Sequence, residues 1–584
     1  MAKMRTASRV RILILLLLLC FGLYALLRPF SGAPVEPIAD GSTLVVELGG
    51  EYIEAPSASP LARLVGEPTR PFVDLLSVFT LAERDARIDA VVLRIQPLEI
   101  GWGKADELRA AIGRLRAKGK QTIALLEVQN FSANKELYVG SAADEIHFAP
   151  GAAVPLVGMA AEYVFLGGFW EMLGIQFDVA RAGKYKSAVE IYAERTMSEA
   201  SREMANSLLD DTYDRFVAAL AEDREQTPDA VRATIDRGLV RTAALVEAGL
   251  VDGEIHLDAL LDRLGGGVVK HADYLHTDPR KLGFDPQTRF ALVYGTGTVV
   301  QGEAEGGPFA GAPSFASESV SRAILEAAED PDIAAIILRI DSPGGSALAS
   351  ELIWRALEQA KAKGKPVIAS FSDVAASGGY YVAAAADAIV SDPGTLTGSI
   401  GVFALRPALK GLLEKLEIGV DSLTRGTHAD FLLSGDKLSP EAHARLQDSV
   451  LETYQLFLAR VAAGRSLTTE QVDAIGQGRV WTGAQAHAAG LVDELGGLYT
   501  AVRRAKREVG LDEDVDVALV PFPKEKPLTQ QLLEVFQGVA AQAALRAAGP
   551  GVRWPAPLDR LAAWTRDMPQ DAPLLIPPVL VEIR

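Results

Sequence analysis

The chain has 584 residues, of which 58 are basic and 76 acidic, and its formal net charge is -18. This charge argues against a nucleic-acid partner, because phosphate binding needs a concentrated basic surface. The single cysteine, Cys20, excludes an intrachain disulfide and a cysteine-based metal site. The seven histidines show no metal-site spacing, so we expect neither a metal nor a cofactor.

The N-terminus has the pattern of a targeting segment. Basic residues precede an unbroken apolar run over 12–27, and Arg28 and Pro29 follow it. Basic residues before such a run place the N-terminus in the cytoplasm and the rest of the chain outside. We interpret 1–34 as a cytoplasmic stub with one transmembrane signal anchor. A cleaved signal peptide is the alternative, because the run is short for a spanning helix.

The body of the chain contains one pattern twice. Segment 88–95 (IDAVVLRI) matches 333–340 (IAAIILRI), an offset of 245 residues (333 − 88). Later matches have offsets that fall to 241, as between 248–252 and 489–493, which both read AGLVD. Two copies of this length indicate two similar domains rather than a short-period array.

We place the two domains at 42–265 and 288–510. In the second, an apolar strand over 335–340 precedes a helix over 347–362, and a new strand begins at 366. The predicted helix has an apolar stripe, formed by Leu348, Leu352, Ile353, Leu357 and Ala360. Strand–helix–strand alternation predicts an α/β fold with parallel sheets.

Residues 511–584 form a C-terminal extension outside both copies. The extension is richer in proline, and its apolar pieces are 528–539 and 575–583. The sequence leaves open whether they pack on the body or face a membrane.

Two turns of the second copy carry residues suited to chemistry. Gly344 and Gly345 end the segment DSPGG after one strand, and their backbone N–H groups suit an oxyanion hole or a phosphate. Ser377 follows the next strand and is flanked by small residues, including Gly378. Ser377 could instead serve only as a helix cap.

The first copy provides an internal control, because it lacks both turns. Asn134 corresponds to Ser377, and Leu98, Glu99 and Ile100 correspond to the Pro-Gly-Gly of the second copy. Turn chemistry needed only for folding would have been retained in both copies. The asymmetry therefore favours a catalytic second copy.

A serine nucleophile needs a base, and no histidine occupies a comparable motif. The first copy contains Lys186 within YKSAVE, where the aligned position of the second copy is Ala429. We therefore interpret the second copy as the source of the nucleophile and the first copy as the source of the base. The alternative for Lys186 taken alone is an ordinary surface lysine.

These motifs resemble those of the signal peptide peptidase A family in its long, duplicated bacterial form. The resemblance rests on DSPGG (341–345), ASGGY (376–380), TLTGSIG (395–401) and YKSAVE (185–190), and it covers the chain to about residue 500. It implies two Clp-protease/crotonase-like domains and a Ser–Lys peptidase.

The resemblance also implies the roles of individual residues. Ser377 would be the nucleophile, Lys186 the general base, and Gly344, Gly345 and Gly378 the oxyanion donors. Ser399 or Thr397 would orient the lysine. The implied enzyme is a homotetramer of the bacterial inner membrane that degrades hydrophobic peptides such as remnant signal peptides, with a cytoplasmic N-terminus and a periplasmic catalytic body.

Two other functions fit parts of the sequence. A crotonase-type acyl-CoA enzyme would use the same oxyanion loop, but it leaves the anchor and Ser377 unexplained. A non-catalytic membrane scaffold would need neither turn, which the intact second copy argues against. Labelling by a fluorophosphonate separates the three, because only an activated serine reacts.

Overall fold

The structure is a computed structural model, and it describes residues 37–55, 70–129, 132–153, 155–238, 241–304, 314–426, 428–433, 435–524 and 574–575. The predicted signal anchor over 1–34 lies outside these residues. In these ranges no helix is both long and apolar enough to cross a membrane.

The first repeat is built on a six-stranded parallel sheet with the order β6-β4-β3-β2-β1-β7. Its strands are β1 (Ser42–Glu51), β2 (Ile88–Glu99), β3 (Gln121–Leu126), β4 (Glu145–Phe148), β6 (Gly253–Glu254) and β7 (Val268–Lys270). Its helices are α3 (Phe72–Arg84), α4 (Trp102–Ala117), α5 (Asn134–Ser141), α6 (Gly167–Leu173), α7 (Glu190–Ala193), α8 (Glu199–Asp223), α9 (Pro228–Asp236), α10 (Thr242–Glu247), α11 (Leu257–Leu264) and α12 (His271–Tyr274).

The second repeat is built on an eight-stranded sheet in which β18-β14-β13-β11-β8-β19 has the strand order of the first sheet, and β15 and β17 are additional. The shared order confirms the predicted duplication and the α/β fold. Its strands are β8 (Thr288–Thr296), β11 (Ile333–Ser342), β13 (Val367–Ala376), β14 (Ala388–Ser391), β15 (Leu396–Gly398), β17 (Val480–Thr482), β18 (Glu494–Leu495) and β19 (Val517–Phe522). Its helical segments are η2 (Pro279–Leu282), α13 (Ser317–Glu329), α14 (Ala347–Ala362), α15 (Gly378–Ala383), α16 (Lys410–Lys415), η3 (Ala429–Leu432), α17 (Pro440–Arg465), α18 (Thr469–Ile475), α19 (Gly483–Ala488) and α20 (Leu498–Glu508).

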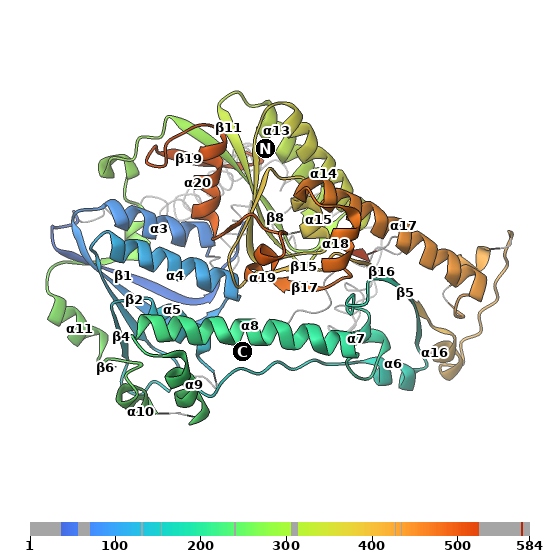
Figure 1. The fold of residues 1–584 in the computed structure, drawn as a ribbon, viewed down its shortest axis with the longest axis horizontal. Helices are drawn as coiled ribbons and strands as arrows, with labels where there is room; N and C mark the ends of the chain where they lie inside the picture. Colours follow the sequence, from blue (N-terminus) through green and yellow to red (C-terminus); the bar gives the residue numbers. More distant parts are fainter. Residues whose placement is uncertain are drawn as a thin grey trace, which may run out of the picture.

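A third sheet joins the two repeats. Its order is β10-β9-β12-β20-β16-β5, so β5 from the first repeat lies beside β16 from the second. Its strands are β5 (Gln176–Ala182), β9 (Val299–Val300), β10 (Phe315–Ala316), β12 (Gly345–Ser346), β16 (Val402–Ala408) and β20 (Leu574–Leu575). Figure 1 shows the first repeat in blue to green and the second in yellow to orange, with β5 and β16 adjacent.

Helix α14 spans the predicted residues, but its predicted apolar stripe is only partly buried. Ile353, Leu357 and Ala360 are buried in the core, whereas Leu348 and Leu352 are 52% and 47% exposed. The helix begins where the Ser346 side chain accepts a hydrogen bond from Ala349 N, a typical serine cap.

The two repeats share an apolar core. One face of the second sheet, with Phe290, Ile337 and Ile368, belongs to the same buried cluster as β1 and β2 of the first repeat. The repeats are therefore not independent bodies joined by a linker.

A buried arginine adds a polar contact between the repeats. Arg339 on β11 is 1% exposed, and its guanidinium bonds Glu54 (2.9 Å) and Glu107 (2.7 Å) of the first repeat. Arg339 and Lys104 hold the pKa of Glu54 at about 2, although burial alone would raise it. Charges taken out of water need such full pairing to be tolerated.

Arg339→Ala is expected to destabilise the protein by about 3–5 kcal/mol, because it removes the buried cation that pairs with Glu107 and one of the two that pair with Glu54. The matched control is Arg94→Ala at the equivalent position of β2. Arg94 is 30% exposed and pairs with partly exposed glutamates, so its loss should cost about 0–1 kcal/mol. Urea denaturation of both variants measures the difference, and equal effects would contradict the structural role given to Arg339.

Candidate active site

Ser377 lies at the turn between β13 and α15, where the sequence predicts it. Its backbone has φ 54° and ψ −112°, a conformation that costs a residue with a side chain of order 1–3 kcal/mol. The Ser377 N–H donates to Gly398 O (2.9 Å) and its carbonyl accepts from Tyr381 N (2.8 Å). Its side chain does not cap α15, which removes the alternative explanation of this serine as a helix cap.

Lys186 reaches Ser377 from the other repeat. Lys186 Nζ lies 2.7 Å from Ser377 Oγ and 2.9 Å from both the carbonyl oxygen and the hydroxyl of Ser399. Both Lys186 and Ser377 are fully buried. The two residues that the sequence analysis pairs across 191 positions therefore meet within one chain.

The surroundings of the Lys186 amine suit its neutral form. A neutral amine has two N–H donors and one lone pair. The carbonyl and hydroxyl oxygens of Ser399 can accept the two donors, which leaves the lone pair for the Ser377 hydroxyl. Burial lowers the pKa of Lys186 well below its ordinary value, because the charged form loses its hydration.

The antiparallel strands β5 and β16 bring Lys186 of the first repeat to Ser377 of the second. β5 and β16 pair from Ala182 opposite Val402 to Gln176 opposite Ala408. Beyond β5, Tyr185 N donates to Gln477 O (2.8 Å). At Gly478, with φ 77°, a Cβ would come 2.6 Å from the Cβ of Lys186, so only glycine fits this close approach.

Residues 476–479 thus support the lysine from the second repeat. Gly478 N also donates to Ile400 O (2.7 Å), and Ser399 N donates to Arg479 O (2.7 Å). The sequence analysis missed this segment. Its two glycines around Gln477, just after a helix, were the available signal.

Of the three predicted oxyanion glycines, two are better placed than the third. The backbone N of Gly345 lies 3.0 Å from the point that a Cβ on Gly378 would occupy, so the two turns are in contact. The N–H of Gly344 already donates to Ser342 Oγ (3.1 Å). The geometry favours Gly345 and Gly378 as donors to a ligand beside Ser377.

The two predicted orienting residues make different contacts. Ser399 bonds Lys186 directly through two oxygens. Thr397 Oγ1 instead donates to Ala375 O (2.7 Å), which ties β15 to β13 below the Ser377 turn. Ser399 can therefore orient the lysine, and Thr397 acts on the strand that carries the serine.

A second buried cluster, which the sequence analysis missed, connects both turns to the first repeat. Lys104 Nζ bonds Asp341 Oδ2 and Asp373 Oδ2, each at 2.8 Å. Burial opposes the lysine's charge, but Asp341, Asp373 and Glu54 hold the pKa of Lys104 well above its ordinary value. Asp341 also accepts from Val374 N (3.1 Å), so one aspartate braces both turns.

An extended strand lies in the third sheet beside these turns. The backbone of β20 runs antiparallel to Gly345 and Ser346 on one side and pairs with Phe403 on the other. The space between β12 and β16 therefore accommodates an extended peptide backbone.

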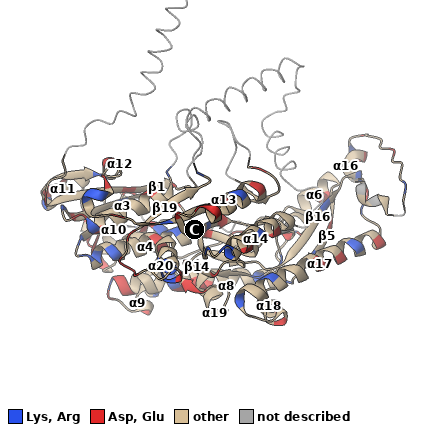
Figure 2. Ribbon diagram, turned by 90° about the horizontal axis from the view of Figure 1, so that it is seen from above, with Lys and Arg blue, Asp and Glu red and all other residues tan. Residues whose placement is uncertain are grey.

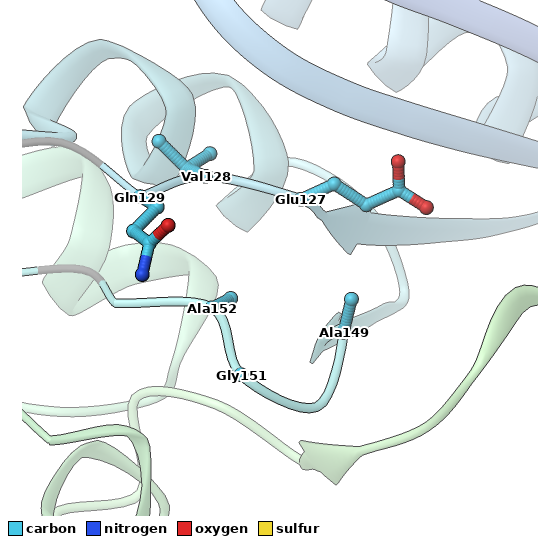
Figure 3. Close-up of a pocket in the computed structure, with 6 residues that line it drawn as sticks. All are labelled: Glu127, Val128, Gln129, Ala149, Gly151 and Ala152. Carbon is cyan, nitrogen blue, oxygen red and sulfur yellow. The ribbon is translucent and has the colours of Figure 1, made fainter.

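In the first repeat, the equivalent edge of the sheet has an asparagine in place of the serine. Asn134, the counterpart of Ser377, donates from its amide to Gly158 O (3.1 Å). The segments that follow β3 and β4 line an open pocket of about 230 Å³, shown in Figure 3. Its lining residues are Glu127, Val128, Gln129, Ala149, Gly151 and Ala152. Apart from Glu127 they carry no charge.

Comparison with known proteins identifies the class. The family model of "Peptidase family S49" matches twice, over residues 114–267 and 359–512. "Serine protease SPPA, chloroplastic" of Arabidopsis thaliana is 36% identical over 88% of this chain and 76% of its own length. "Protease 4" of Haemophilus influenzae is 30% identical over 76% of this chain and 74% of its own length.

These matches show that the molecule is a serine protease. The chain belongs to peptidase family S49, with one family domain in each repeat. Among solved structures, a membrane-bound stomatin-specific protease aligns with 40% of this chain and 98% of its own at 17% identity and a TM-score of 0.26.

The depressed pKa of Lys186 predicts a measurable pH dependence of stability. Between the folded and the unfolded pKa, the unfolded chain binds a proton that the folded chain does not, so stability rises with pH by up to about 1.4 kcal/mol per pH unit. Lys186→Met removes this pH dependence. The free energy of unfolding of the variant should therefore exceed that of the wild type by more at pH 7 than at pH 10.

Urea denaturation at the two pH values measures this difference. Lys118→Met, at a solvent-exposed lysine, is the control, and its stability should equal that of the wild type at both pH values. A Lys186→Met variant no more stable than the wild type at pH 7 would contradict a neutral buried lysine.

Proposed function

We propose that this chain is a membrane-anchored serine endopeptidase with Ser377 as nucleophile and Lys186 as general base. The observation that carries the proposal is the distance of 2.7 Å between Lys186 Nζ and Ser377 Oγ, both of which belong to fully buried residues. Each domain is proposed to have the Clp-protease/crotonase-like fold.

The mechanism follows from the contacts. The neutral amine of Lys186 takes the hydroxyl proton as Ser377 Oγ attacks the scissile carbonyl. The N–H groups of Gly345 and Gly378 then stabilise the oxyanion, by about 3–4 kcal/mol for each donor in comparable sites. Lys186 gives its proton to the leaving amine, and the same lysine activates the water that hydrolyses the acyl-enzyme.

The proposed substrates are hydrophobic peptides, in particular signal-peptide remnants released in the membrane. Support comes from the strand-shaped space between β12 and β16, which suits an extended chain rather than a folded protein. The small residues around Ser377, including Ala375 and Ala376, leave room for a substrate backbone. A similar protein of Enterococcus faecium is named "Putative signal peptide peptidase SppA".

The proposed location is the bacterial inner membrane, with residues 1–34 as a single-pass anchor, the N-terminus in the cytoplasm and the catalytic body in the periplasm. Support comes from the basic residues before the apolar run over 12–27. The proposed assembly is a homo-oligomer, a tetramer by the family resemblance.

Ser377→Ala is expected to lower peptide hydrolysis by about 10⁴-fold or more and to abolish fluorophosphonate labelling, while the unfolding midpoint stays near that of the wild type. The matched control is Asn134→Ala, the same position in the first repeat, which should keep labelling and turnover. Wild-type turnover by Ser377→Ala would overturn the assignment.

Lys186→Arg should be as inactive as Lys186→Ala, because arginine keeps its proton at any working pH. Wild-type activity should rise with pH as Lys186 loses its proton. Mixing Ser377→Ala with Lys186→Ala subunits should not restore activity, since the pair is proposed to form within one chain. An active Lys186→Arg enzyme would place the base elsewhere.

The substrate proposal is tested with a peptide library and with intact cells. Apolar peptides should be cleaved faster than charged peptides of equal length, and folded proteins should resist. Deleting residues 1–34 behind a cleavable export signal should release an active enzyme from the membrane fraction. Equal cleavage of charged and apolar peptides would contradict the proposed substrate class.

A further inference from the structure

Lys104 is a buried cation that the proposed mechanism does not use. It stands in the first turn of α4 in the first repeat and is 3% exposed. Helix α4 lies beside α20 of the second repeat (Figure 2), and Leu498 N at the start of α20 donates to the Glu107 carboxylate on α4. Helix α4 thus brings Lys104 from the first repeat into contact with the second.

The partners of Lys104 stand on the two strands that precede the reactive turns. An ammonium group has three N–H donors. Lys104 Nζ lies 2.8 Å from Asp341 Oδ2, 2.8 Å from Asp373 Oδ2 and 3.3 Å from Glu54 Oε1. Asp341 is in β11, just before the oxyanion turn, and Asp373 is in β13, just before Ser377. One cation therefore contacts both strands that carry the proposed reactive groups.

The pairing of β11 with β13 is irregular at the same level. Ile340 lies opposite Phe371, but the next pair joins Ser342 to Ala375. Strand β13 thus advances by four residues (375 − 371) where β11 advances by two (342 − 340). Both aspartates lie inside this irregular stretch. Because an irregularity of this kind interrupts the backbone ladder, side-chain contacts can set the spacing of the two turns that follow.

The duplication shows that each repeat has kept a different half of this cluster. At the offset of 245 residues, the two aspartates correspond to Gln96 and Val128 in the first repeat, and Lys104 corresponds to Ala349 in the second. The acidic half stays with the reactive turns and the basic half stays in the other repeat, which is also how the proposed nucleophile and base are divided. A cluster needed only to fold a repeat would have been retained in both.

We propose that Lys104 is a positioning residue of the peptidase, and that its ammonium holds the oxyanion turn in place relative to the nucleophile turn. Through the two aspartates it sets where the N–H groups of Gly345 and Gly378 lie relative to Ser377 Oγ. A misplacement of about 1 Å at such a site can lower the rate by about 10²-fold. The inference rests on the proposed function and deepens it, since it adds a residue that acts on the reactive groups without touching the substrate.

A triple variant tests the role of the ammonium. Lys104→Met alone would leave buried carboxylates without a cation, so the variant also carries Asp341→Asn and Asp373→Asn. The two amide oxygens can still accept from Val374 N and from the backbone N of residue 104, which are the partners of the carboxylates in the wild type. The unfolding midpoint in urea should therefore stay near that of the wild type.

The catalytic constants should separate positioning from folding. In the triple variant, kcat for an apolar peptide should fall by about 10²-fold with little change in KM, and the rate of fluorophosphonate labelling should fall with it. The rise of activity with pH should be kept, because Lys104 does not contact Lys186. Wild-type kcat in the folded variant would overturn the proposal. A displaced pH profile would also overturn it, since Lys104 would then act on the base.

The matched control removes another ion pair of the same helix. Arg109 on α4 pairs with Asp223 on α8 at 2.8 Å, inside the first repeat and away from both turns. Arg109→Met combined with Asp223→Asn should keep kcat and the labelling rate, even if the unfolding midpoint falls. An equal loss of kcat in the control would show that any damage to α4 lowers turnover, which would overturn the specific role of Lys104.

Asp341→Asn alone provides a milder test that does not depend on the triple variant. Lys104 keeps Asp373 and Glu54 as partners in this variant, and its kcat should fall by about 10-fold, because only one of the two ties to the reactive turns is lost. Wild-type turnover by Asp341→Asn would contradict the proposal. Labelling of the wild type at Ser377 tests the proposed function separately: an unlabelled wild type contradicts that function, whereas equal labelling of wild type and variants contradicts only the role of Lys104.

Discussion

A lysine can accept a proton near neutral pH only if water is kept from its amine, and in this molecule neither repeat does that alone. Lys186 comes from the first repeat, but Ser377, Ser399 and the 476–479 segment that enclose it come from the second. The proposed chemistry therefore depends on the pairing of β5 with β16. A displacement of either strand would admit water and return the lysine to its charged form.

The same dependence explains why charged side chains are buried between the repeats. Arg339, Lys104 and Glu54 lie where the first repeat meets the carboxyl ends of β11 and β13. Buried ion pairs contribute little net stability compared with apolar packing, but they penalise any misalignment strongly. Such a penalty suits a junction that must keep an accurate geometry, since Asp341 also accepts from Val374 N on the strand before Ser377, and Asp373 accepts from Gly101 N of the first repeat.

Much of this arrangement could be predicted from the sequence, because duplication makes one copy a control for the other. The matching apolar segments of β2 and β11 predicted the parallel sheets, and the difference between Asn134 and Ser377 indicated the reactive turn. The sequence did not reveal which side of α14 faces solvent, because Leu348 and Leu352 have the spacing of core residues. It also missed Lys104, whose partners Asp341 and Asp373 are more than 200 positions away.

The segment 476–479 was missed for a related reason. Its contribution is made by backbone groups and by the absence of a side chain at Gly478, and neither produces a pattern of residue types. Arg339 did carry a signal, since a charged residue inside an apolar strand requires a buried partner. Its partners, Glu54 and Glu107, stand in the other repeat, where only the fold could locate them.

The replacement of the serine and lysine positions by Asn134 and Ala429 has an evolutionary consequence. A protein made of identical single repeats would have to keep nucleophile and base in every unit, and each substitution would alter every contact between units. Fusion of two units lets the residues on one side of each repeat diverge without loss of hydrolysis. The positions that correspond to the serine and the lysine in the opposite repeat are then free to vary, while selection on the chemistry acts on a single junction in each chain.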